Sequence, residues 1–149
     1  MSADFIFSIC GNLVLPGWLL LILLPNWRWT LALVTAVIIP FTLGVVYISL
    51  MISQLGNLPE GVGFGSIEAV RAGFSNDYIL VAGWVHYLAF DLFVGAWAVR
   101  DSQKIGLSHW FVMPCLALTF MLGPTGLAVY LLMRFVKTRN MQILEPVDA

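Results

Sequence analysis

Charged side chains are scarce in this chain of 149 residues, of which 10% are charged and 60% hydrophobic. A soluble domain of similar length carries about 25% charged residues. With a mean hydropathy of +0.94, the composition predicts a single membrane domain over residues 1–149, because too little polar sequence remains for a second domain. The net charge of −1 provides no basic face to hold phosphates, which argues against nucleic acid as a partner.

Cysteines and targeting signals are equally scarce. Two cysteines make neither a disulfide framework nor a structural zinc site. Met-Ser-Ala-Asp leads straight into the first apolar run, without the basic segment or the small-residue cleavage site of a signal peptide. No transit peptide is recognisable either, so we expect a multi-pass protein of a bacterial cytoplasmic (inner) membrane.

Motifs for hydrolysis and for cofactor binding are also missing. The sequence contains no GxSxG, HExxH or Walker pattern. The two histidines, His86 and His109, fall at depths that differ by about 15–20 Å along the expected helices, so one haem held by both is not expected. We therefore predict no cofactor and no metal site.

Four apolar runs have the roughly 20 residues that a helix needs to cross about 30 Å of hydrocarbon. They cover about residues 5–24, 30–53, 79–99 and 110–136. This pattern predicts an all-α fold, in which four transmembrane helices form a bundle. An even number of spans places both termini on one face.

The connection between the second and third runs contains a glycine-rich segment followed by a short helical pattern. Ser66 is a suitable N-cap, and Ile67, Val70 and Phe74 fall on one apolar stripe. The pattern predicts a short interfacial helix lying on the membrane surface. A loop folded over the bundle fits it equally well.

Basic residues and tryptophans indicate how the four-span bundle lies in the membrane. The basic residues differ little in number between the two faces, a small bias toward cytoplasmic termini. Those on the expected terminal face are Arg71, Arg134, Lys137 and Arg139, and those on the other face are Arg28, Arg100 and Lys104. Four tryptophans near the non-terminal face match an interfacial aromatic belt: Trp27, Trp29, Trp97 and Trp110.

An acidic residue, Asp91, lies near the midplane of the third run, roughly 18 Å from the face at which that run begins. An ionised carboxylate there costs about 2.5–3.5 kcal/mol on insertion scales, so it must face protein or water or be protonated. Pro16-Gly17, Pro40 and the Gly-Pro-Thr-Gly segment at 123–126 interrupt the other runs at similar depth. Such breaks mark binding sites in transporters or are kinks that only improve packing. We predict a cavity or groove that reaches Asp91 between the first, third and fourth spans.

His86 lies on a different edge of the third run. Asp91 lies five positions further along the chain, which places the two side chains about 140° apart around the helix. They do not form a metal-binding pair, but they can flank one cavity. Asn12 and Tyr130 fall near the depth of His86, so a hydrogen-bonded histidine is the alternative to a functional one.

Asp101 and His109 bracket the third connection, RDSQKIGLSH. Their spacing fits a solvated loop, but Gly106 permits a tight turn that brings them together. We predict a structural role, in which they hydrogen-bond each other or the neighbouring backbone and tie the third span to the fourth. Two ligands without a third make a poor metal site.

A longer pattern combines several of these residues: W-x-H-x-x-x-x-D-L-F at residues 84–93, then Asp101, His109 and a GP-x-G turn at residues 123–126. It resembles the neoxanthin-synthase-like family, first named for abscisic-acid deficiency in plants, over about residues 5–136. The resemblance implies a helical membrane protein linked to carotenoids. Plant members are plastid proteins needed to convert violaxanthin, an epoxide, into the allenic neoxanthin. The residues that the resemblance marks are Trp84, His86, Asp91, Asp101, His109 and Pro124.

Conversion of an epoxide into an allene requires an acid at the oxygen and a base for a carbon-bound proton. Midplane burial favours the neutral acid form of Asp91, which can donate, and a neutral His86 can accept. These two residues are the candidate catalytic pair. The candidate substrate-binding residues are Trp84, Tyr87, Phe90, Phe93, Asn12, Thr119, Pro124 and Tyr130.

Three functions remain open, all with membrane lipids as surroundings. The chain is an isomerase for a carotenoid or related isoprenoid, a non-catalytic pigment- or lipid-binding subunit of a larger photosynthetic or respiratory membrane complex, or a small transporter. A pocket at Asp91 favours the enzyme, and dry packing of the polar residues favours the subunit. Water access from both sides favours the transporter.

Overall fold

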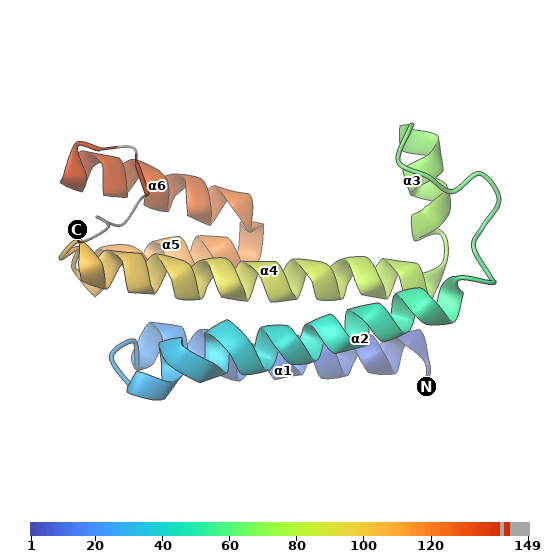
Figure 1. The fold of residues 1–149 in the computed structure, drawn as a ribbon, viewed down its shortest axis with the longest axis horizontal. Helices are drawn as coiled ribbons and strands as arrows, with labels where there is room; N and C mark the ends of the chain where they lie inside the picture. Colours follow the sequence, from blue (N-terminus) through green and yellow to red (C-terminus); the bar gives the residue numbers. More distant parts are fainter. Residues whose placement is uncertain (141, 144–149) are drawn as a thin grey trace, which may run out of the picture.

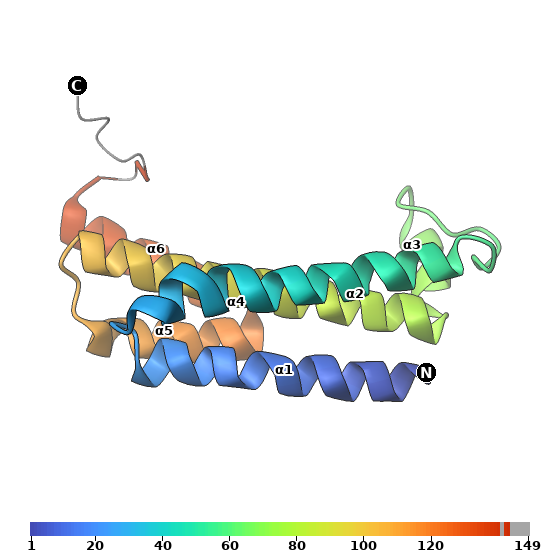
Figure 2. The same cartoon turned by 60° about the horizontal axis from the view of Figure 1, so that its bottom comes forward.

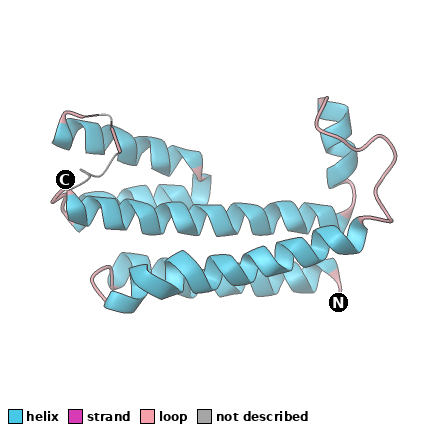
Figure 3. Cartoon of the chain, viewed as in Figure 1, coloured by secondary structure: helices cyan, strands magenta, loops and turns pink. Residues whose placement is uncertain are grey.

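The computed structural model describes residues 1–140, 142 and 143, including every side chain but that of Leu33. This part of the chain is helical and contains no strand (Figure 3). Three long helices lie side by side: α1 (Ala3–Leu23), the helix made of η1 (Thr30–Ile38) and α2 (Ile39–Gln54), and α4 (Asp77–Lys104) (Figure 1). Each is long and apolar enough to cross a membrane. The all-helical fold is thus confirmed, and three of the predicted spans have matching helices.

Helix α4 is the central element, because every other helix packs against it. Its 28 residues extend over about 42 Å. Asn76 caps its start by accepting hydrogen bonds from the backbone N–H groups of Tyr78 and Ile79 at 2.9 and 3.3 Å. Residues on α4 are therefore held at defined depths, which fixes the position of Asp91.

Small residues allow α1 to pack closely against α4. A β-carbon on Gly95 would lie 2.9 Å from the Trp18 ring, and one on Gly17 would lie 3.0 Å from a Leu92 methyl group. Lipid tails are as apolar as leucine, so helices in a membrane associate through close packing of this kind. The two glycines make room for Trp18 and Leu92 between the helices.

The second long helix starts as a π-helix, η1, and changes to an α-helix at α2. At the junction the N–H of Ile39 donates to the carbonyl of Val34, five residues earlier. Pro40 follows directly and has no N–H to donate. The hydroxyl of Thr35 donates to the carbonyl of Thr30 at 2.6 Å, and both threonines are fully buried. The interruption predicted at Pro40 is therefore a change of helix type.

The predicted fourth span is not continuous. Residues 109–138 form two shorter helices, α5 (His109–Leu122) and α6 (Pro124–Thr138), which fold back on each other as a hairpin (Figure 1). With 14 and 15 residues, each extends over about 21–23 Å, less than the 30 Å of hydrocarbon. The hairpin enters the bundle beside the end of α4 and turns back near its middle, so the four-span topology is wrong.

Three residues at the turn explain why the chain reverses. Gly123 has φ +47° and ψ −100°, a conformation that side chains disfavour. Pro124 is the first residue of α6, where its missing N–H costs nothing. Gly126 packs against α5 so tightly that a β-carbon would overlap the backbone of Thr119 and lie 2.5 Å from the carbonyl oxygen of Cys115.

The short helix α3 (Ile67–Phe74) lies across the axis of the bundle (Figure 1). As expected, Ser66 caps it, by accepting a hydrogen bond from the N–H of Ala69 at 3.1 Å. The Phe74 ring packs on Gly83 at the start of α4, where a β-carbon would lie 2.7 Å from it. The helix thus has the orientation of a membrane-surface helix and also packs on the bundle.

The hairpin changes the charge distribution between the two ends of the molecule. The N-terminus and the end of α6 now lie at opposite ends of the bundle, so the prediction of both termini on one face is wrong (Figure 1). Six of the seven lysines and arginines fall at one end, which we call the basic end. They are Arg28, Arg100, Lys104, Arg134, Lys137 and Arg139. Such a bias predicts that the basic end is cytoplasmic.

This topology can be tested by labelling single cysteines with a membrane-impermeant maleimide in intact cells. Cys10 and Cys115 are buried and unpaired and would first be replaced by serine. We expect Asn57→Cys, in the α2–α3 loop, to react from outside. We expect Ser108→Cys and Arg139→Cys, both at the basic end, to react only after permeabilisation. Labelling of Arg139→Cys together with Asn57→Cys would restore the four-span topology.

Candidate functional site

Asp91 lies at the middle of α4, directly beside the turn of the α5–α6 hairpin. A β-carbon on Gly123 would lie 3.1 Å from Oδ2 and 3.2 Å from Oδ1 of Asp91, and 3.2 Å from the Tyr87 ring. A glycine is thus needed for the turn to approach the carboxyl group. The Oδ2 atom of Asp91 is buried and has no hydrogen-bond partner among the described residues. An unpaired buried polar atom is costly, so this oxygen marks a position where a ligand group or a proton is favoured.

Four aromatic residues from α1, α4 and α5 lead away from Asp91, and we call them the aromatic strip: Phe7, Trp84, Tyr87 and Phe120. The Trp84 ring lies 5.3 Å from the rings of both Phe7 and Tyr87, measured between centroids. The Tyr87 hydroxyl donates to the carbonyl of Phe120 at 3.2 Å. The ring contacts join Phe7, Trp84 and Tyr87 into one surface that begins beside the carboxyl group, and the Phe120 ring packs on Trp18, 5.5 Å away between centroids.

The aromatic strip is open on one side. The exposed fractions are 45% for Phe7 and 38% for both Trp84 and Phe120. The hairpin covers α1 and α4 only in the half of the bundle toward the basic end (Figure 2). In the other half the strip faces the space that lipid fills, over about 10 Å between the levels of Asp91 and Trp84.

His86 is not part of this arrangement. Its ring lies 4.5 Å from the Phe90 ring and 5.9 Å from the Tyr47 ring of α2, measured between centroids. Asp91 contacts the hairpin turn, whereas His86 lies on the edge of α4 that meets α2. The structure thus does not bring the two predicted catalytic residues together. Phe90 and Phe93 are exposed on α4 outside the strip.

The hairpin also moves several predicted substrate-binding residues. Tyr130 was placed at the depth of His86 by counting along a continuous span, but the reversal carries it to the basic end, where it bonds Asp101. The Thr119 hydroxyl donates to the carbonyl of Cys115 at 2.8 Å, within its own helix. Asn12 is exposed on α1, and Pro124 is exposed at the start of α6.

A buried ion pair holds α6 against α4. The Oδ2 atom of Asp101 accepts hydrogen bonds from the Tyr130 hydroxyl at 2.5 Å and from Nε of Arg134 at 2.9 Å. The side chains of Asp101 and Arg134 are only 11% and 9% exposed. Nη1 of Arg134 donates to the carbonyl of Gln142 at 2.9 Å. We call Asp101, Tyr130 and Arg134 the hairpin clamp.

His109 ties the hairpin to α1. Its Nε2 atom lies 2.9 Å from the carbonyl oxygen of Ile22, to which it donates. Of the two predicted alternatives, a bond between Asp101 and His109 is not present within the described residues. His109 bonds a backbone carbonyl, and Asp101 bonds the side chains of Tyr130 and Arg134. The hairpin clamp joins α4, the third predicted span, to α6. His109 joins α5 to α1, the first predicted span.

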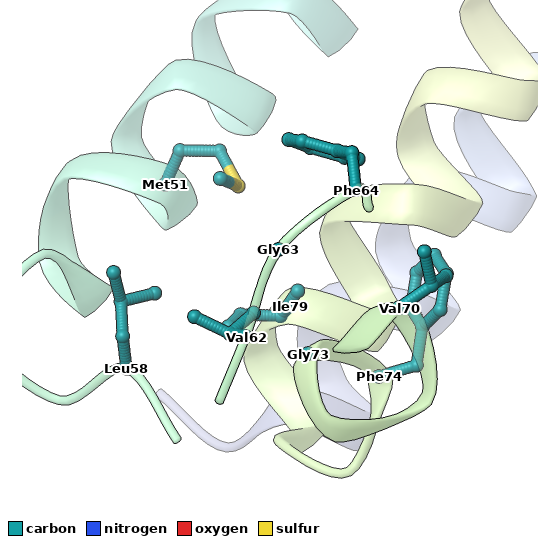
Figure 4. A pocket seen from close by; sticks show the side chains of 9 residues that line it. All are labelled: Met51, Leu58, Val62, Gly63, Phe64, Val70, Gly73, Phe74 and Ile79. Atoms are coloured by element: carbon teal, nitrogen blue, oxygen red, sulfur yellow. The ribbon is translucent and has the colours of Figure 1, made fainter. Parts of the chain in front are cut away.

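An apolar pocket of about 240 Å³ lies far from Asp91, where the loop before α3 meets α2 and α4 (Figure 4). Its side chains carry no charge, and among them Met51, Phe64 and Phe74 come from α2, the loop and α3. It is not the cavity that was predicted at Asp91, which stays a prediction. The pocket can hold a ligand through apolar contacts, but no acidic, basic or nucleophilic side chain is among its described lining residues.

Sequence reasoning missed four residues at these sites. Phe7 and Phe120 lie on helices other than α4, and an aromatic residue in an apolar run carries no signal. Gly123 was recognised as a helix break, but its contact with Asp91 requires the chain to reverse. Arg134 gave a usable signal, because a cation inside an apolar run requires a partner.

The fold and the site define a class: a helical membrane protein with a half-length hairpin whose turn meets a carboxyl group beside an aromatic surface. A family model described as ABA DEFICIENT 4-like matches residues 5–130. Since this match covers most of the chain, the protein belongs to that family, and the resemblance seen in the sequence is confirmed. No curated protein and no solved structure matches the chain. The matched residues include Asp91, the aromatic strip and the hairpin turn.

The hairpin clamp predicts a large effect of removing one charge. Asp101→Asn should lower the free energy of unfolding by about 3–5 kcal/mol, because Arg134 is left buried without its counter-ion. Thermal unfolding of the purified protein in neutral detergent measures the loss. Asp101→Asn combined with Arg134→Met should regain part of it. Lys137→Gln, which changes an exposed residue on the same helix as Arg134, is the control. An equal loss of stability in Asp101→Asn and Lys137→Gln would contradict the clamp.

Proposed function

We propose that this protein binds a carotenoid or a related isoprenoid along the aromatic strip and exchanges a proton with it through Asp91. The observation that carries the proposal is the unpartnered Oδ2 atom of Asp91 at the end of a half-exposed aromatic surface. Membership of the ABA DEFICIENT 4-like family supports a carotenoid-related role. The proposed setting is a bacterial cytoplasmic membrane.

The aromatic strip suits a long conjugated hydrocarbon chain. Flat aromatic rings offer a flat, rigid apolar ligand a large contact area. Trp84 has two ring neighbours, Phe7 and Tyr87, which hold it in place. A ligand can reach the strip sideways from the lipid, without passing through water.

The polar end of the ligand would reach Asp91 from the aromatic strip, because Gly123 of the hairpin turn packs against the carboxyl group on its other side. The apolar surroundings favour the protonated, uncharged form of the Asp91 carboxyl group. A neutral carboxylic acid donates a hydrogen bond to a hydroxyl or epoxide oxygen. The Tyr87 hydroxyl is held by the carbonyl of Phe120, so it fixes the wall of the site.

Asp91 can carry out both proton transfers of an isomerisation in turn. For the epoxide that the family resemblance implies, the acid gives its proton to the oxygen while a carbon–oxygen bond breaks. The carboxylate then takes a proton from a neighbouring carbon, and the electrons of that bond form a new double bond. The sum is an isomerisation without an oxidant or reductant, and it restores the acid. His86 is not needed, since it lies on another edge of α4.

Asp91→Asn tests the proton transfer. Asparagine keeps the shape and can hydrogen-bond the ligand, but it cannot give up and regain a proton. We expect ligand binding to persist and the conversion rate to fall by about 10²- to 10⁴-fold, the usual contribution of a general acid. Bound pigment is measured by absorbance and mass spectrometry, and conversion by chromatography of the extracted ligand. Full conversion by this variant would exclude Asp91 as the proton donor.

Trp84→Leu tests the binding surface separately. Purified wild-type protein should carry a carotenoid or isoprenoid, and the variant should retain at most about a tenth of it because it loses both ring contacts. Phe90→Leu is the matched control, since it removes an exposed ring from the same helix outside the strip. Equal pigment in the two variants would contradict binding along the strip. Loss of pigment in both would point to general instability, which thermal unfolding reports.

A further inference from the structure

A second pocket, of about 340 Å³, lies at the basic end, where the connection between α1 and η1 meets the last turns of α4. The residues that matter among its lining are Asn26, Trp27, Arg28, Leu31, Arg100 and Gln103. It is separate from the aromatic strip and plays no part in the proposed function. Its chemistry is different, because two cations line it.

The two arginines of this pocket are available to a ligand. Arg28 comes from the connection and Arg100 from α4, and neither forms an ion pair or hydrogen bond with a described residue. The guanidinium carbon of Arg28 lies 4.5 Å from the centre of the Trp29 ring, which orients the group without occupying its N–H donors. Each guanidinium carries five donors in a planar fork that matches phosphate oxygens.

Among the described residues, no carboxylate lines the pocket to neutralise the arginines. Asp101 follows Arg100 directly in the sequence, but its carboxyl group is held by Tyr130 and Arg134 on the hairpin. The rim of the pocket is fixed in position, because Nε2 of Gln103 donates to the carbonyl of Pro25 at 3.0 Å and to Oδ1 of Asn26 at 3.1 Å. The result is a braced site with a net positive charge.

The surroundings indicate where a phosphate would come from. Trp27 and Leu31 also line the pocket, so it joins an interfacial tryptophan to the first apolar turn of the long second helix. Basic pockets between membrane helices on the cytoplasmic side bind the headgroups of anionic lipids. The charge bias places this end in the cytoplasmic leaflet. We infer that Arg28 and Arg100 bind the phosphate headgroup of an anionic phospholipid, with its acyl chains lying along the start of η1.

Lipid exchange onto the purified protein tests this site. Native mass spectrometry would compare phosphatidylglycerol with phosphatidylcholine of the same acyl chains, and inorganic phosphate alone would be added as a competitor. Wild-type protein should prefer phosphatidylglycerol at least tenfold, and Arg28→Gln with Arg100→Gln should remove the preference. Arg71→Gln, at the opposite end, and Lys137→Gln, at the basic end outside the pocket, should keep it. Arg28→Lys with Arg100→Lys should retain part of it.

Different results would contradict the site itself and the assignment of its ligand to a lipid. An unchanged preference in the double glutamine variant, or no preference in the wild type, would overturn the site. Displacement of the lipid by millimolar inorganic phosphate would show that the pocket binds a free anion, and it would overturn the assignment to a lipid headgroup. If the double variant does not fold, as thermal unfolding in neutral detergent shows, each single glutamine variant should still lower the preference severalfold, and no loss in either would overturn the proposal.

Discussion

The buried pair of Asp101 and Arg134 is the interaction on which the arrangement of the C-terminal third of the chain depends. Two charges are taken out of water, and each is tolerated only because the other is present, together with the Tyr130 hydroxyl. A continuous fourth span would have carried Arg134 to the opposite end of the bundle from Asp101. Pairing the two requires the chain to reverse, and the reversal brings Gly123 against Asp91. The position of the candidate site thus follows from an ion pair about half a bilayer away.

The parts of the fold that depend on local chemistry could be predicted from the sequence. Run length and hydropathy identified the three long helices, and Ser66 was recognised as the cap of α3 because capping requires only neighbouring residues. The hairpin could not be predicted from run length, since residues 110–136 are apolar and long enough to span. What decides against a span is the contact of Gly126 with α5 and the pairing of Arg134, both of which depend on the folded chain. The local signs in that run were a cation, Arg134, and the interruption at residues 123–126.

The candidate site was predictable to a similar extent. An acid in the middle of an apolar helix singled out Asp91, and helical spacing showed that His86 lies on another edge. The neighbours of Asp91 were less accessible, because depths counted along a continuous span placed Tyr130 near His86 rather than near Asp101. Family resemblance marked Asp101 and His109 without indicating their partners. The structure shows that both fasten the hairpin, which relates these marked positions to the geometry around Asp91.

The half-length hairpin gives the molecule different cross-sections in the two leaflets. Toward the basic end α5 and α6 lie beside the three long helices, whereas at the other end only the short helix α3 packs on them (Figure 2). The protein therefore displaces more lipid from the leaflet at the basic end than from the opposite leaflet. A wedge of this shape fits best in a membrane whose leaflet at the basic end is the more expanded. The free energy of the protein in the bilayer should therefore depend on the local curvature of the membrane.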